Sequence, residues 1–116
     1  MKHLPKHLRP RWRYLAVELR GPQGSGFDRG TFQREVWFAA QNLIGDAGSA
    51  NVDLSVLRFE FEDDRGHAIV RARRGEENRA RAVLACVDAV DGADLGVRVR
   101  GTSGTVRACA DEHLDA

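Results

Sequence analysis

The order in which the hydrophobic period changes along the chain constrains the fold more than any other feature of this sequence. Alternation of apolar and polar residues, as around Leu15, Val17 and Leu19, is typical of a half-buried strand. Apolar residues at 3.6-residue spacing indicate an amphipathic helix. In chain order the pattern predicts a strand over 13–19, a helix over 28–46, strands over 57–61 and 67–73, a helix over 77–90 and a strand over 96–100.

The order β-α-β-β-α-β predicts an α+β fold of the ferredoxin-like type, which the RNA-recognition-motif domain shares. In this fold a four-stranded antiparallel sheet carries both main helices on one face. The usual strand order, 4-1-3-2, places the first and third strands in the centre. We therefore expect the second face of the sheet to be open to solvent or to a ligand.

Turn and capping residues set the expected boundaries. Asp28 can cap the first helix, Gly45 and Gly48 can end it, residues 63–66 form a hairpin turn, and Asp91-Gly92 ends the second helix. Both helices and the second strand contribute apolar residues to the expected core. These are Phe32, Val36, Ala39, Ala40, Leu43, Ile44, Leu57, Phe59, Phe61, Ala80, Val83, Leu84, Val87 and Val90, with Cys86 on the buried side of the second helix.

A chain of 116 residues is long enough for one core. Residues 1–10 hold two of the three prolines and show no hydrophobic period, so we expect a basic N-terminal arm. Residues 11–107 form the single α/β sandwich domain, and residues 108–116 form a short acidic tail. No apolar run approaches the length of a membrane span, and the two cysteines show no disulfide or zinc pattern, so we expect a cytoplasmic protein that contacts no membrane.

The charge distribution points to a polyanionic partner. Only Lys2 and Lys6 of the 18 basic residues are lysines, and the arginines offer planar forks that pair bidentately with phosphate. Residues 1–14 and 95–110 are basic and contain no acidic residue. On the predicted sheet, Tyr14, Ile69, Arg71, Arg73, Arg98 and Arg100 would face the open side, where the arginines could bind RNA or another polyanion. Alternatively, this face is merely solvated, with Glu18, Glu60 and Glu62 neutralising the arginines by cross-strand pairs.

The segment Gly101-Thr102-Ser103-Gly104-Thr105 follows the last strand. Its glycines permit tight turns and its three hydroxyls add hydrogen-bond donors, so it could cradle a backbone phosphate between Arg100 and Arg107. The full set of candidate RNA-binding residues is Lys6, Arg9, Arg11, Arg13, Tyr14, Arg71, Arg73, Arg98, Arg100, Thr102, Ser103, Gly104, Thr105 and Arg107.

No catalytic constellation is found. The four histidines have no carboxylate or nucleophile at a fixed spacing, and Asp63-Asp64 is better explained as a solvated turn than as a metal site. On the first helix, Trp37 and Phe38 are adjacent, so we expect either that one packs inward and the other anchors a protein partner, or that both are buried in a broad core.

Four stretches resemble protein component 2 of archaeal ribonuclease P. They are Leu8 to Ala16, Trp37 with Ala40, Leu43, Gly45 and Gly48, Gly66 to Arg73, and Val97 to Val106. The Gly-Thr-Ser-Gly-Thr segment is the most specific of them. Family members often end in a basic tail, whereas residues 108–116 here are acidic.

The resemblance implies a subunit of the endoribonuclease that removes the 5′ leader from precursor tRNA. It implies that the RNA subunit performs the chemistry with bound magnesium, so that this chain supplies no catalytic residue and binds no metal or cofactor. The implied partners are ribonuclease P RNA, protein component 3 with the other protein subunits, and precursor tRNA.

Two alternatives share the fold. Arg20 to Phe27 looks like the phosphate-binding loop of acylphosphatases, but Asp28 stands where that family has arginine, and the end of the second strand reads Phe61-Glu62-Asp63 instead of providing an asparagine. The other alternative is a ferredoxin-like regulatory module that binds a small metabolite.

Overall fold

The computed structural model describes residues 11–21 and 27–114. The elements in chain order are β1 (Trp12–Arg20), α1 (Arg29–Val52), β2 (Ser55–Glu62), β3 (Arg65–Arg73), α2 (Glu77–Ala85), β4 (Ala89–Val90), β5 (Ala93–Asp94), β6 (Gly96–Ser103), α3 (Val106–Cys109) and one π-helical turn (Ala110–Leu114).

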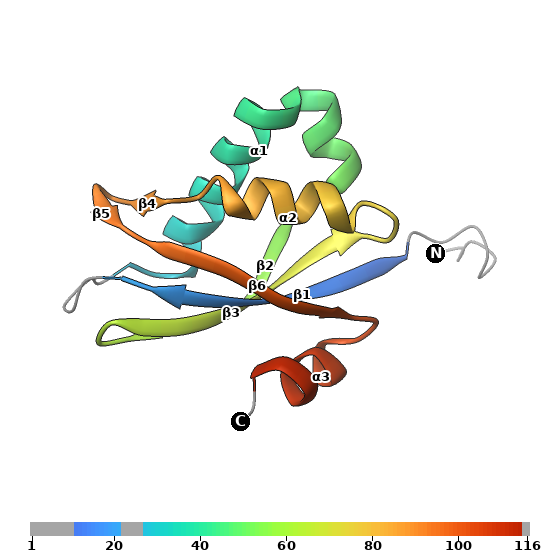
Figure 1. Ribbon diagram of the computed structural model, residues 1–116. Helices are drawn as coiled ribbons and strands as arrows, with labels where there is room; N and C mark the ends of the chain where they lie inside the picture. Colours follow the sequence, from blue (N-terminus) through green and yellow to red (C-terminus); the bar gives the residue numbers. More distant parts are fainter. Residues whose placement is uncertain (1–10, 22–26, 115–116) are drawn as a thin grey trace, which may run out of the picture.

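The main sheet has four antiparallel strands in the order β2-β3-β1-β6. Since β6 is the fourth strand of this sheet, the order is the predicted 4-1-3-2. Helices α1 and α2 cover one face of the sheet, as Figure 1 shows. The predicted α+β, ferredoxin-like class is therefore confirmed.

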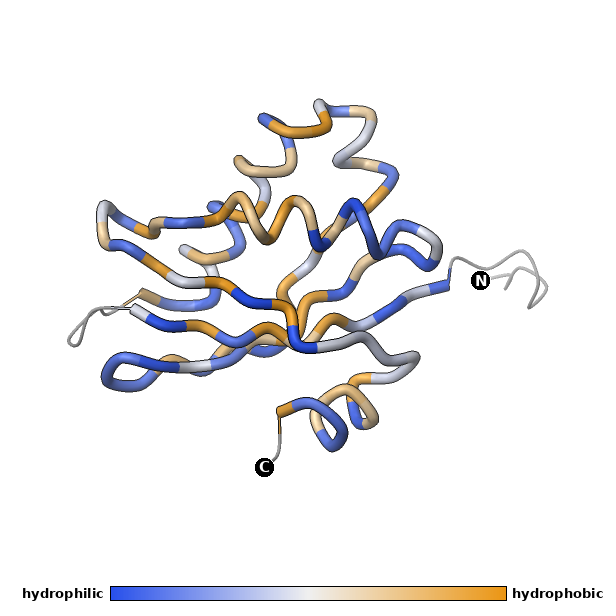
Figure 2. The backbone as a smooth tube through the Cα atoms, in the orientation of Figure 1, coloured by the Kyte–Doolittle hydropathy of each residue, from blue (hydrophilic) through white to orange (hydrophobic). Residues whose placement is uncertain are grey.

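The core lies between these two helices and the sheet. Apolar and polar residues alternate along the strands (Figure 2), so each strand presents one apolar row to the helices. From β1 the row is Leu15, Val17 and Leu19, all fully buried. Phe32, Val36 and Ala40 of α1 pack against it as the helical spacing predicts.

Helix α1 begins as predicted, because the Asp28 side chain accepts a hydrogen bond from the Thr31 backbone N–H. Its predicted end near residue 46 is wrong. Gly45 leaves the helical conformation (φ 72°, ψ 178°), but helix resumes beyond it and runs to Val52. Leu43, expected in the core, lies two residues before this kink and is 47% exposed.

The second helix is shorter than predicted. It ends at Ala85, and β4 and β5 form a small hairpin joined by Asp91-Gly92, both with positive φ. Val87 and Val90 are still buried, but from the turn and from β4 rather than from a helix. Cys86 is exposed, contrary to the prediction, because it lies outside the buried helical stripe that Ala80, Val83 and Leu84 form.

Strand β2 contains an irregularity that the alternation does not reveal. Its register with β3 shifts between Val56 and Arg58, which turns Leu57 out of the core, so that this residue is 41% exposed. Side chains of α1 hold the shifted strand: Gln33 Oε1 accepts from Val56 N–H at 2.6 Å, and Arg29 donates to Val56 O at 3.0 Å.

The second face of the sheet is not open over its centre, so that prediction is wrong. Val106–Leu114, called here the C-terminal segment, folds back across it, on the side opposite to α1 and α2 (Figure 1). Cys109 and Ala110 pack on Ala16 and Ile69 in a second, smaller core. The expected boundary at residue 107 therefore falls inside a packed element, at least as far as Leu114. The acidic side chains of Asp111 and Glu112 lie on its exposed side.

Candidate nucleic-acid interface

The C-terminal segment divides the second face into two ends. One end contains the start of β1 and the ends of β3 and β6, and we call it the basic end. The other contains the end of β1, the β2–β3 turn and the start of β6, and we call it the mixed end. The predicted continuous row of cations across the sheet is therefore interrupted. Of the predicted RNA-binding residues, Lys6 and Arg9 lie outside the described residues.

At the basic end, arginines surround the Trp12 ring. The Arg71 guanidinium lies 4.0 Å from the ring centroid and that of Arg73 lies 5.4 Å away. Arg73 also donates to Asn51 O at 3.1 Å and lies 3.6 Å from an Asp53 carboxylate oxygen. Arg71 thus retains a charge without a carboxylate partner among the described residues, whereas Arg73 is partly neutralised.

Two residues of the basic end were missed by the sequence analysis. Trp12 directly precedes the predicted strand 13–19, and Arg74 directly follows the predicted strand 67–73. The Arg74 backbone N–H donates to Arg11 O at 2.8 Å, which extends the β1–β3 pairing by one step. The acid-free composition of residues 1–14 was the available signal for Trp12. For Arg74, the available signal was the local density of positive charge, since three of the four residues 71–74 are arginines.

The structure does not assemble the hydroxyls of Gly101-Thr102-Ser103-Gly104-Thr105 into a phosphate cradle. The first three residues belong to β6. Ser103 is buried, and the Thr105 hydroxyl accepts a hydrogen bond from Ala108 N–H at the start of α3. Tyr14 is half-buried against the C-terminal segment, and its carbonyl accepts a hydrogen bond from Cys109 Sγ at 3.4 Å. Gly104 and Arg107 remain exposed.

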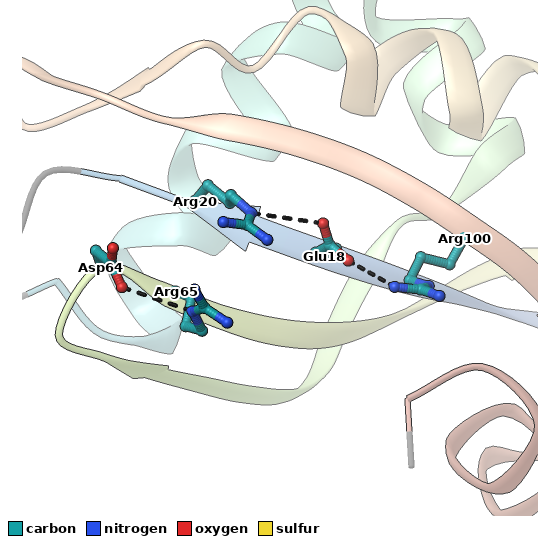
Figure 3. A network of polar contacts seen from close by, with 5 residues as sticks. All are labelled: Glu18, Arg20, Asp64, Arg65 and Arg100. Carbon is teal, nitrogen blue, oxygen red and sulfur yellow. Dashed lines mark hydrogen bonds and ion pairs between the residues drawn. The ribbon is translucent and has the colours of Figure 1, made fainter. Parts of the chain in front are cut away.

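At the mixed end, cations and carboxylates pair with each other, as Figure 3 shows for five of them. Arg100 donates to Glu18 at 2.7 Å, and Arg20 lies 3.8 Å from the same carboxyl group. The hydrogen bond from Arg100, with the charges of the surrounding arginines, lowers the pKa of Glu18 below its ordinary value. The alternative, in which glutamates of neighbouring strands neutralise the arginines, is therefore confirmed for Arg100, which pairs with Glu18. Arg98 is exposed and pairs with no carboxylate in the described part of the chain.

Replacing Glu18 with glutamine should destabilise the protein at neutral pH by at most about 1 kcal/mol, since the pair is near the surface. Because the pKa of Glu18 is lower in the folded state, its contribution is present above the unfolded pKa and is lost as the pH falls through the folded pKa. Urea unfolding of wild type and Glu18→Gln at a series of pH values should show the largest difference at pH 7 and a smaller one as the pH falls below the unfolded pKa. A difference that does not shrink on acidification would contradict the assignment, and Glu62→Gln on the exposed side of β2 is the matched control.

Both candidate partner-binding residues are exposed, so the expectation that one or both pack inward is wrong. Trp37 is 51% and Phe38 is 59% exposed on α1. The Trp37 indole N–H donates to Leu54 O at 3.1 Å, which fixes its ring on the surface. This aromatic pair lies on the helix layer, and Trp37 shares a surface pocket with Asp53, the carboxylate partner of Arg73.

The described residues do not support a metal site, a membrane-spanning helix or an acylphosphatase-like anion site. They contain no group of three or more His, Cys, Asp or Glu side chains placed to hold a metal ion. No described helix is long and apolar enough to cross a membrane. Asp28 caps α1 and so does not serve an anion in the manner of an acylphosphatase arginine, although most of the loop compared with that family (22–26) lies outside the described residues.

The fold and the arginine-lined sheet end define a class of ferredoxin-like domains suited to binding nucleic acid. Comparison with known proteins identifies the family within this class. The model of the Rpp14/Pop5 family matches residues 13–114. This chain belongs to that family.

Similar proteins include several named ribonuclease P protein component 2. The one from Natronomonas pharaonis is 66% identical over 114 residues, which is 98% of this chain and 71% of that protein. The one from Haloarcula marismortui is 60% identical with the same coverage. The one from Methanosarcina acetivorans is 35% identical and covers 98% of this chain and 82% of its own length.

A solved structure supports the fold. A chain of yeast ribonuclease MRP, determined by cryo-electron microscopy, superposes with a TM-score of 0.60 at 16% identity, covering 82% of this chain and 75% of that one. At this identity the likeness concerns the fold alone.

Proposed function

We propose that this chain is the component 2 protein subunit of an archaeal ribonuclease P, the ribonucleoprotein that removes the 5′ leader from precursor tRNA. The observation that carries the proposal is the 66% identity to the component 2 protein of Natronomonas pharaonis over nearly the whole chain. The alternatives of an acylphosphatase and a metabolite-binding module are not favoured, because the family model accounts for residues 13–114.

In this proposal the chain binds and supports the RNA subunit. The basic end, together with Arg98, Arg107, Lys6 and Arg9, supplies guanidinium and ammonium groups for backbone phosphates. The surface supports contact with phosphates more than contact with bases, since the C-terminal segment covers the central strands on which related folds stack bases.

The division of labour follows from the family resemblance. We propose that the RNA subunit and its magnesium ions perform the cleavage, and that this chain contributes no catalytic residue. Protein component 3 would dock on the exposed aromatic pair Trp37 and Phe38 of α1, the helix that lies on the face of the sheet opposite to the C-terminal segment.

The test is reconstitution from purified parts. Ribonuclease P RNA of the same organism, component 3 and the remaining protein subunits are mixed with 5′-labelled precursor tRNA and magnesium, with or without this chain. We expect leader removal to rise at least about 10-fold at limiting magnesium when the chain is present, because its cations reduce the repulsion within the folded RNA. Equal rates with and without the chain would refute the proposed function.

A further inference from the structure

A small cavity lies at the basic end, beside the first residue that the structure describes. It measures about 300 Å³ and is lined by Arg11, Trp12, Arg13, Tyr14, Arg74 and Gly104. Three of its six lining residues are arginines: Arg13 lies in β1, Arg11 precedes β1 and Arg74 follows β3. The backbone hydrogen bond from Arg74 to Arg11 keeps these two residues adjacent.

None of the three arginines pairs with a carboxylate within residues 11–21 and 27–114. The nearest carboxylates along the chain are committed elsewhere: Glu76 pairs with Arg79 at 3.8 Å, and Glu77 accepts the Gly75 backbone N–H. Residues 1–10, which precede the cavity in the chain, contain no acidic residue. The cavity therefore concentrates positive charge that the described protein does not neutralise, unlike Arg73 and Arg100.

Gly104 makes room for one of these groups. A Cβ atom at this position would lie 3.1 Å from an Arg13 guanidinium nitrogen, which is tighter than an ordinary contact. The glycine thus lets the Arg13 head group lie directly beside the turn that leads from β6 to α3. Its φ is not in the left-handed region, so the backbone itself does not demand glycine there.

We propose that this cavity is a binding site for a backbone phosphate of RNA, held by Arg11, Arg13 and Arg74. The inference rests on the proposed function, adds Arg74 as a site residue, and gives Gly104 the role of making room for Arg13. Guanidinium groups pair bidentately with phosphate oxygens, and a polyanion relieves the repulsion among several of them. The adjoining Trp12 ring already has a guanidinium over it, so the site offers ion pairs rather than a free aromatic surface.

The test measures affinity and its dependence on salt. Full-length chain is titrated with ribonuclease P RNA of the same organism at several monovalent salt concentrations. The double variant Arg13→Gln/Arg74→Gln should bind about 10-fold more weakly at low salt. It should also lower the slope of log affinity against log salt by about 1 to 2, since each lost phosphate contact removes nearly one unit. The control Arg34→Gln/Arg81→Gln removes the same charge from exposed positions of α1 and α2, and we expect it to keep the wild-type slope.

A slope in the double variant equal to that of the control would overturn the proposal. Should the double variant fail to fold, Gly104→Glu and Gly104→Gln provide an equivalent test. The two side chains fill the same space, but only the glutamate brings an anion to the arginines, so only Gly104→Glu should reduce the slope. Equal slopes for these two variants would likewise overturn it.

Three further outcomes bear on this site and on the proposed function. If poly-glutamate displaces the RNA as effectively as unlabelled RNA does, the site takes acidic polypeptide and the assignment to RNA is wrong. If the wild-type chain does not bind the RNA, the proposed function fails and this inference with it. If the wild type binds with a steep salt slope that the double variant shares, only this inference fails.

Discussion

Replacing Gly66 with alanine should lower the free energy of unfolding by about 3 kcal/mol or more. Gly66 pairs with Phe61 beside the β2–β3 turn, and β2 passes so close that a Cβ atom would lie 2.7 Å from Phe61 Cα and 2.9 Å from the Glu60 carbonyl carbon. Real Cβ atoms do not approach backbone this closely, so the two strands would have to separate. Overpacking against backbone is among the few single changes that cost this much.

Thermal and urea unfolding measure this effect. For a domain of this size the midpoint temperature should fall by more than about 10 °C. Gly30→Ala is the matched control: the atom nearest to its added Cβ is Asp28 Oδ1 at 3.6 Å, and alanine is favoured over glycine in a helix. Gly30→Ala should leave stability unchanged or raise it. A Gly66→Ala protein as stable as Gly30→Ala would show that the strands are not paired as described.

Replacing Gly101 with valine should displace the C-terminal segment from the sheet. The His113 ring lies over Gly101, and a Cβ atom there would be 2.6 Å from two of its nitrogens. Cys109 reports the displacement, since burial raises the pKa of its thiol to about 11 from an ordinary 9.0. Exposure would return the pKa toward that ordinary value, so the reactive thiolate fraction near pH 8 should rise roughly 100-fold.

A thiol-reactive disulfide reagent makes this measurement with an internal standard. In the wild type, Cys86 is exposed and should react at once, while Cys109 should react slowly. In Gly101→Val both should react quickly, and adding His113→Ala should restore part of the protection by removing the ring that valine displaces. Continued protection of Cys109 in Gly101→Val would mean that His113 merely swings aside and does not anchor the segment.

The main sheet and its two helices could be predicted from sequence because each signal was local. Alternation in β1 and β3 and helical spacing in α1 depend on residues within one element, so the β-α-β-β-α-β order follows from them. The Asp91-Gly92 hairpin was missed although the signal was present. Asp-Gly is a strong two-residue hairpin pair, and here it was interpreted as a helix end because buried valines continued the helical spacing to Val90.

The covered sheet face could not be predicted, because it depends on a contact between segments far apart in the chain. Ala108 to Leu114 is short and carries Asp111 and Glu112, which favours an exposed tail when the segment is considered alone. Its apolar residues Cys109 and Ala110 become significant only beside Ala16 and Ile69. The small residue Gly101 was interpreted as a turn former, whereas its lack of a side chain accommodates His113.

Only some of the arginines of the candidate site could be predicted from the sequence, because their pairing also depends on contacts between distant segments. Sequence shows which residues are basic and on which side of a strand they lie, but not which carboxylates meet them. Glu18 lies 82 positions from Arg100 and still pairs with it. Arg74 was omitted because it lies just past the predicted strand, although the Arg11–Arg74 backbone hydrogen bond continues the β1–β3 pairing.

RNA is proposed to lie along the basic end, and directed cleavage from tethered iron measures where the RNA lies relative to the protein. In a Cys86→Ser background, an iron chelate is attached through Asn78→Cys, four residues after Arg74, or through Asp64→Cys in the β2–β3 turn at the opposite end of the sheet (Figure 1). Both positions are exposed, and buried Cys109 leaves the single new thiol as the attachment point. We expect hydroxyl radicals generated at residue 78 to cut ribonuclease P RNA at discrete positions and those generated at residue 64 to leave it intact. Cuts from residue 64 that equal or exceed those from residue 78 would contradict the account.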